Sequence, residues 1–191
     1  MPKTSTNSRA AAIETRAEKV LRKAQAFSVP VDLDRACTSL GVTVHYEQLE
    51  DKVSGVLMIK GGEKHALINV DHHPNRQRFS LAHEIGHLVL HACLDDRLFI
   101  DTNMRVYQRV GAPSDEAYAN GESLTTPTEE KEANLFASAL LMPEDLLRAA
   151  ALHLDLEEEA DVALLARTFS VSDQAMSIRL QQLGLLKVAF F

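Results

Sequence analysis

The apolar positions of this chain recur at helical spacing towards its two ends and alternate with polar positions in between. An Ala-rich segment at 9–26 predicts an amphipathic helix. A second, short helix is predicted at 32–40, where Asp32 can cap the N-terminus and Gly41 can end the helix.

After Gly41 the period changes to two. Short apolar segments of this kind predict β-strands, which we place at 42–46, 55–60 and 65–70. Gly61-Gly62 separates the last two segments and is typical of a tight hairpin turn.

The second half of the chain is predicted to be mainly helical. One long helical pattern covers 75–94, and another begins at Thr126, where Thr-Pro-Thr-Glu matches a capping box. Residues 95–126 hold few periodic apolar positions, so we expect an irregular segment there with one strand near 104–110. Helical patterns resume after Pro143. Together, the predicted helices and strands indicate an α+β protein with a small antiparallel or mixed sheet.

Composition narrows the classes of protein to consider. With 191 residues, 46% of them hydrophobic and 25% charged, the chain is typical of a globular domain. A net charge of −7 argues against a protein that coats nucleic acid. No apolar run approaches the roughly 20 residues of a membrane span, and the N-terminus lacks the order of a secretory signal. We therefore expect a cytoplasmic protein with no membrane partner, and read Cys37 and Cys93 as free thiols.

The histidines are unevenly distributed, and this clustering indicates chemistry. Six of the eight fall within 27 consecutive residues, namely His65, His72, His73, His83, His87 and His91. The first three are expected at an ordinary strand end and helix entry. His83-Glu84-Ile85-Gly86-His87 is an HExxH motif, in which residues four apart share one helical face and can reach one ion. Zinc in such a site lowers the pKa of a bound water towards about 7, and Glu84 is placed to accept its proton.

A catalytic zinc commonly has three protein ligands, so a third is needed. His91 lies about 12 Å along the helix axis from His83, which is too far for one tetrahedral ion. The acids near the start of the next helix are the candidates. Glu129 is occupied by the expected capping box, whereas the helical wheel leaves Glu130 and Glu132 open. Asn134 is one turn after Glu130 and could support a ligand there.

Longer segments carry a more specific pattern than HExxH alone. They are RQRFSLAHEIGHLVLH (76–91), EKEANLFASALLMP (130–143) and F-x-VS-x-x-AM-x-x-RL-x-x-LGL (169–185). On these segments the chain resembles the ImmA/IrrE family of small metallopeptidases over about residues 10–186. The resemblance implies that the third ligand is Glu130, with Glu132 as the second choice.

The resemblance also implies a zincin-like fold. We expect a zincin-like metallopeptidase domain at 9–143 and a C-terminal helical region at 144–191. Residues 1–8 are rich in Thr, Ser and Asn, which predicts a disordered N-terminus. The implied cofactor is one divalent metal, foremost zinc, bound by His83, His87 and Glu130, although manganese or iron would also accept these ligands.

The C-terminal pattern at 165–185 is that of two helices joined by a tight turn, as in a helix-turn-helix. The only cations between 163 and 191 are Arg167, Arg179 and Lys187, a small number for contacts with phosphates. We therefore favour a structural or protein-docking role for these helices over direct DNA binding.

Two functions of different classes follow. The first is a metallo-endopeptidase, and the family resemblance implies a transcriptional repressor with its own helix-turn-helix as substrate, cleaved to derepress phage, mobile-element or stress genes. The second is a DNA- or protein-binding regulator with a structural or vestigial metal site. Glu84 favours the enzyme. It is not a metal ligand, so a structural metal site would not require it, whereas a hydrolase requires a carboxylate to accept a proton from water.

Two expectations concern the substrate. An extended peptide binds most easily by adding a strand to a sheet edge, and we expect 55–60 or 65–70 to offer that edge. Selectivity would come from docking of a partner protein on 144–186, with low activity on casein. Four residues are candidates to stabilise the oxyanion, and the spacing does not rank them: His91, Tyr107, Arg109 and Tyr118.

Overall fold

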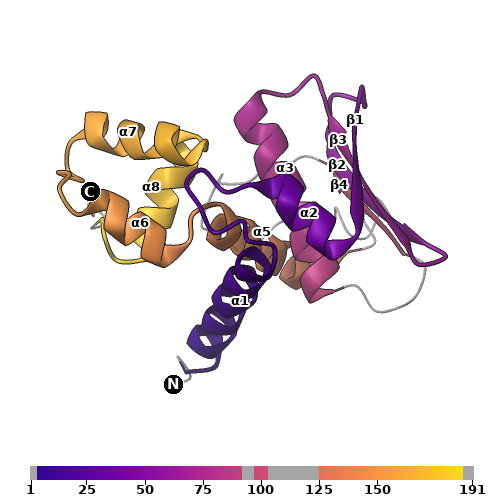
Figure 1. Ribbon diagram of the computed structural model, residues 1–191, viewed down its shortest axis with the longest axis horizontal. Helices are drawn as coiled ribbons and strands as arrows, with labels where there is room; N and C mark the ends of the chain where they lie inside the picture. Colours follow the sequence, from indigo (N-terminus) through magenta and orange to yellow (C-terminus); the bar gives the residue numbers. More distant parts are fainter. Residues whose placement is uncertain (1–3, 92–96, 103–124, 187–191) are drawn as a thin grey trace.

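A computed structural model describes residues 4–91, 97–102 and 125–186 of the chain. A small sheet lies at one end of the molecule, and the helices lie to one side of it (Figure 1). Before the HExxH segment the elements are α1 (Thr4–Lys23), α2 (Leu33–Leu40), β1 (Val42–Glu47), β2 (Val53–Lys60) and β3 (Glu63–Asn69). From that segment onward they are α3 (Pro74–Leu90), β4 (Arg97–Thr102), α5 (Pro127–Leu141), α6 (Glu144–Ala151), α7 (Glu159–Phe169) and α8 (Asp173–Gln182).

The sheet is mixed, which confirms the α+β expectation in its coarse form. Its strand order is β1-β3-β2-β4, with β1 parallel to β3 and the other two pairs antiparallel. Gly61 and Gly62 form the predicted hairpin turn, with φ of 59° and 86° that favour glycine. β4 was missed from the sequence, because its six residues lie in the segment expected to be irregular.

The expectation that β2 or β3 offers a free sheet edge is wrong. β3 lies between β1 and β2, and β2 lies between β3 and β4. Among the described strands, the edges are therefore β1 and β4. The pairing of β4 with β2 joins segments separated by the whole of α3, and no local pattern in the sequence announces it.

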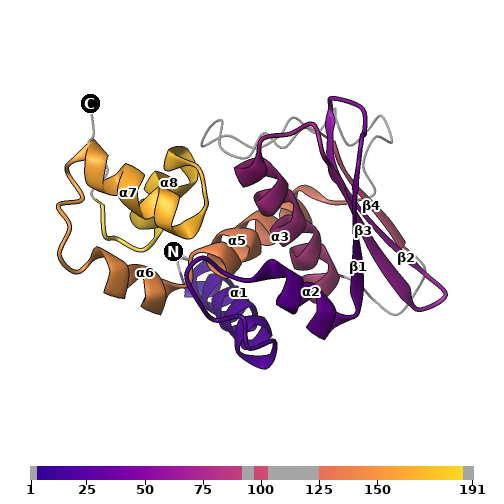
Figure 2. The same cartoon turned by 45° about the horizontal axis from the view of Figure 1, so that its top comes forward.

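The helices form successive layers on the sheet. α3 packs on β2 and β3, α5 packs on α3, and α1 packs on α5, so that α3 lies between the sheet and α5 (Figure 2). α1 begins at Thr4, so the segment expected to be disordered, 1–8, is helical from Thr4 onward. The short polar residues there are common in the first turn of a helix. Within the described part of the chain, no helix is long and apolar enough to cross a membrane.

The C-terminal helices α6, α7 and α8 lie at the end of the molecule opposite the sheet (Figures 1 and 2). They share one hydrophobic core with α1 and α5, to which Leu147, Phe169 and Leu180 contribute. Arg179 of α8 is fully buried; its Nε donates to the Met142 carbonyl at 3.0 Å, and its guanidinium pairs with Glu14 of α1. The C-terminal region is thus integral to the packing around α5.

Local signals placed both ends of α2 correctly. Asp32 caps the helix and Gly41 ends it in the left-handed region, and Ser172 caps α8 in the same way as Asp32 caps α2. Cys37 is a buried free thiol, and burial raises its pKa to about 12, so the thiol is neutral at physiological pH. Cys93 and the strand expected near 104–110 lie outside the described residues.

Candidate metal centre

The HExxH residues lie within α3, in the layer between the sheet and α5. Pro74 stands in the first turn of α3, where its missing N–H costs no hydrogen bond, and His73 caps the helix. Farther along, Leu81, two residues before the motif, and Ile85, within it, are buried. A packed helix of this kind holds its functional side chains rigidly.

Gly86 allows α5 to approach α3 closely. A Cβ at this position would lie 3.0 Å from the Ala133 carbonyl oxygen and 3.1 Å from the Ala133 Cα. Both atoms belong to the backbone and cannot rotate away. The glycine inside the motif therefore sets the interhelical distance, and this distance brings the first turns of α5 to the two histidines.

His83, His87 and Glu130 converge at one point. The two Nε2 atoms are 2.9 Å apart, and each lies 3.3 Å from an oxygen of Glu130. Zinc bonds of about 2.0–2.1 Å in a tetrahedron separate the ligand atoms by about 3.3 Å. The two histidines are almost fully buried, while Glu130 is partly exposed. Donor set and spacing thus fit a divalent metal, and the three residues could hold one.

Hydrogen bonds and burial prepare these groups as ligands. His83 Nδ1 lies 3.0 Å from Asn134 Oδ1, so Nδ1–H donates to the amide oxygen and the Nε2 lone pair points to the shared position. Burial lowers the pKa of His87, although Glu130 opposes this, so its ring is neutral at physiological pH. Burial raises the pKa of Glu130, but its contacts with the two histidines outweigh burial and hold the pKa well below its usual range.

Glu84 is buried beside these residues and lies against β2. A Cβ on Gly55 would come within 2.8 Å of Glu84 Oε1 and 3.3 Å of its Cγ. Only glycine at position 55 therefore leaves room for the carboxylate where it lies. In the register of the sheet, Gly55 pairs with Asp101 of β4, so the edge strand β4 runs next to the strand that contacts Glu84.

Glu132, the alternative third ligand, points elsewhere. Its carboxylate accepts hydrogen bonds from Arg9 Nε and Nη2 at 2.7 and 2.6 Å, and lies 3.1 Å from His91 Nε2. Hydrogen bonds from Arg9, with the nearby His91, lower the pKa of Glu132 to about 2. Residues two apart on a helix face different directions, so Glu130 and Glu132 serve different neighbours.

A comparison with models of known protein families identifies the family of this chain. Residues 37–181, well over half of the chain, match the family model described as the IrrE N-terminal-like domain, Peptidase_M78. The chain belongs to this family. The resemblance to ImmA/IrrE proteins is thereby confirmed, and the family supports a metallopeptidase-like protein.

A solved structure of similar fold belongs to a longer protein. A Mycobacterium tuberculosis transcriptional regulator matches with a TM-score of 0.57 and 20% sequence identity, over 90% of this chain and 46% of that chain. At this identity the likeness concerns the fold alone, and the IrrE-like chain spans less than half the length of that regulator. The comparison with curated proteins gave no match.

Several residues of the site were not expected from the sequence. Thr125 Oγ1 donates to Glu130 Oε1, and Arg9 reaches Glu132 from α1, 123 positions away. His91 was considered as an oxyanion stabiliser, but its Nδ1 faces His87 Nδ1 at 3.3 Å. The spacing of four between His87 and His91 could have indicated this contact, whereas nothing local marks Arg9. The other oxyanion candidates, Tyr107, Arg109 and Tyr118, lie outside the described residues.

Proposed function

We propose that this protein is a metal-dependent endopeptidase that hydrolyses a peptide bond in a protein partner. The observation that carries the proposal is the convergence of His83, His87 and Glu130 at the spacing of tetrahedral zinc ligands, next to the buried Glu84. Zinc suits two imidazoles and a carboxylate, and manganese or iron would compete for the same donors.

The role of each residue in the site follows from the chemistry of its side chain. His83, His87 and Glu130 would bind the metal, which supplies Lewis-acid activation of a water and of the scissile carbonyl. Glu84 would accept the proton of the water as its oxygen attacks the carbonyl carbon. When the C–N bond breaks, Glu84 would deliver that proton to the leaving nitrogen. The products are a new amine and a new carboxylic acid, which retains the second hydrogen of the water until it ionises in solution, and Glu84 is regenerated.

β4 is the strand best placed to receive an extended substrate. It is an edge of the sheet among the described strands, and it pairs with β2, which contacts Glu84 through Gly55. A peptide added to β4 would bind through its main chain, which gives little sequence selectivity.

Selectivity then requires a second contact, for which we propose the C-terminal helices. Leu152 and Leu164 are large apolar side chains exposed on this region, at 72% and 44%. The implied partner is a transcriptional repressor with a helix-turn-helix, whose cleavage would derepress phage, mobile-element or stress genes. This substrate class is an inference from the resemblance to the ImmA/IrrE family, and one protein of similar fold is described as a transcriptional regulator.

The experiment compares wild-type protein with Glu84→Gln, both loaded with zinc. The amide cannot take a proton, so Glu84→Gln should retain one zinc per chain and the wild-type unfolding transition but lose most peptide hydrolysis. Glu157→Gln changes an exposed acid on the C-terminal region and should leave activity unchanged. Wild-type activity in Glu84→Gln would instead favour the other function, a regulator with a structural metal.

A further inference from the structure

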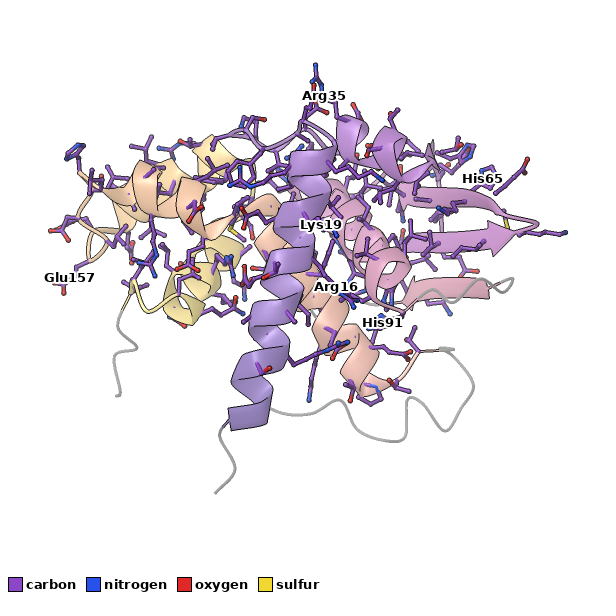
Figure 3. The ribbon with its side chains drawn as sticks, turned by 60° about the horizontal axis from the view of Figure 1, so that its bottom comes forward. Arg16, Lys19, Arg35, His65, His91 and Glu157 are labelled. Carbon is purple, nitrogen blue, oxygen red and sulfur yellow. The ribbon has the colours of Figure 1, made fainter. Side chains whose placement is uncertain are left out.

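A chain of polar contacts leads from His87 away from the converging ligand atoms and ends on α1. His87 Nδ1 lies 3.3 Å from His91 Nδ1, and His91 Nε2 lies 3.1 Å from Glu132 Oε2. Glu132 accepts two hydrogen bonds from the guanidinium of Arg9, at 2.6 and 2.7 Å. The four side chains come from α3, α5 and α1, and Figure 3 shows His91 at the end of α3 with α1 passing in front.

Proton positions along this chain follow from metal binding at His87. If the Nε2 lone pair of His87 is reserved for a metal, the ring proton is on Nδ1 and is donated to His91 Nδ1. His91 then carries its own proton on Nε2 and donates it to Glu132. Arg9 supplies only donors, and the carboxylate of Glu132 only acceptors. Each of these contacts therefore has one donor and one acceptor, and the donors converge on Glu132, from His87 and His91 on one side and from Arg9 on the other.

The two histidines differ in how they are supported. His83 meets the amide of Asn134 directly. Glu132 reaches His87 only through His91, which stands one turn after His87 on the same face of α3. The imidazole of His91 is only 5% exposed and Glu132 is 16% exposed, so solvent competes weakly for these contacts.

We propose that His91, Glu132 and Arg9 are positioning residues that fix the Nδ1–H tautomer and the ring orientation of His87 as a metal ligand. The inference rests on the metal site of the proposed function, though not on its peptidase activity. It also makes α1, which contributes no ligand, a part of the metal centre. Loss of such outer partners typically weakens metal binding about 10- to 100-fold.

The test uses the affinity of the full chain for Zn²⁺, measured by competition with a chromophoric chelator. His91→Leu removes both hydrogen bonds and should weaken Zn²⁺ binding about 10- to 100-fold. His91→Gln offers an amide oxygen to His87 and an amide N–H to Glu132, and should recover much of the loss. Glu132→Ala should weaken binding more than Glu132→Gln, because the amide oxygen still accepts from His91.

Arg9→Ala has a matched control on the same helix. Arg16 is exposed on α1 and labelled in Figure 3, so Arg16→Ala should leave the affinity unchanged, whereas Arg9→Ala should lower it. Nitrogen-15 spectra of the imidazoles give a second measurement, since zinc-loaded wild-type protein should show a protonated Nδ1 on His87. In His91→Leu the Nδ1 signal of His87 should broaden or shift. This measurement remains informative even if the substitution alters the unfolding transition of the protein.

The outcomes separate this inference from the proposed function. Wild-type Zn²⁺ affinity in His91→Leu, or equal affinities in His91→Leu and His91→Gln, would overturn the positioning role. A wild-type protein without measurable Zn²⁺ binding would overturn it as well. A protein in which His91→Leu weakens Zn²⁺ binding but the wild type cleaves no peptide would support the inference and contradict the peptidase.

Discussion

A single methyl group added at Gly55 should separate activity from stability. In Gly55→Ala the new Cβ would lie 2.8 Å from Glu84 Oε1, against an ordinary contact of 3.4 Å or more. The carboxylate must therefore move by about 0.6 Å, the difference between these two distances. A misplacement of about 1 Å can cost about 100-fold in rate. We expect kcat/KM to fall about 10- to 100-fold, equivalent to about 1.4–2.7 kcal/mol.

The free energy of unfolding of Gly55→Ala should be unchanged or slightly higher than that of the wild type. Glycine inside a strand is less favourable than alanine by roughly 0.5–1 kcal/mol, and the atom that must yield is the end of a side chain. The free energy of unfolding of Gly55→Ala, measured in urea, should therefore lie within about 1 kcal/mol of wild type.

The assay is cleavage of a peptide that the wild-type protein hydrolyses, followed by chromatography at several substrate concentrations, with zinc content measured on the same samples. Gly55→Ala should retain one zinc per chain, because the three atoms nearest to the new Cβ belong to Glu84 and Ile68 and not to the ligands. Wild-type kcat/KM in a folded, zinc-loaded Gly55→Ala would refute the placement of Glu84 as the proton acceptor.

Other predictions follow from the same contacts. Gly86→Ala should destabilise the protein by about 1–3 kcal/mol in urea unfolding, despite the higher helix propensity of alanine, because the methyl group meets the backbone of α5; an unchanged or higher stability would contradict the account of the α3–α5 approach. Arg179→Met should destabilise by about 3 kcal/mol because it leaves Glu14 without its cation, and adding Glu14→Met should restore part of the loss in the same assay. Zinc at 100 times its Kd should stabilise the wild type by about 2.7 kcal/mol and Glu130→Ala far less, as judged by melting with and without a chelator. Leu152→Ser with Leu164→Ser should slow cleavage of a protein partner more than cleavage of a short peptide around its scissile bond, and an equal effect on both substrates would argue against docking on the C-terminal helices.

The C-terminal region also shows why substitution is preferable to truncation in such tests. α8 places Arg179 in the core against Glu14 and the Met142 carbonyl, and Leu180 is fully buried. Removal of 157–191 would expose this core, so both protein and peptide cleavage would be lost through unfolding. Exposed residues such as Leu164 can be changed without that consequence.

Local chemistry explains which parts of the fold could be predicted. Asp32, Gly41 and the capping box at Thr126 act within one turn of the chain, and the structure places helix ends at each of them. The Gly61-Gly62 hairpin is equally local. β4 could not be placed, because its pairing with β2 depends on residues about 40 positions away. The expected substrate edge failed for the same reason.

In the candidate site, too, the local features could be predicted from the sequence and the long-range contacts could not. Helical spacing alone brought His83 and His87 to one face and separated His91 from His83. It could not choose between Glu130 and Glu132, which the structure resolves through their neighbours: Glu130 faces the two histidines, and Glu132 is held by Arg9. Arg9 is 123 positions from its partner, so its contribution emerges only from packing of α1 on α5.

The most direct test of the central claim is cleavage of the proposed substrate, a helix-turn-helix transcriptional repressor, in water enriched in oxygen-18, analysed by mass spectrometry. Zinc-loaded wild-type protein should give two fragments, with one oxygen-18 atom in the new carboxylate. Chelated protein and zinc-loaded Glu84→Gln should give neither fragment. Cleavage that persists at the wild-type rate in Glu84→Gln, or an intact repressor with the zinc-loaded wild type and with every peptide tested, would contradict the account.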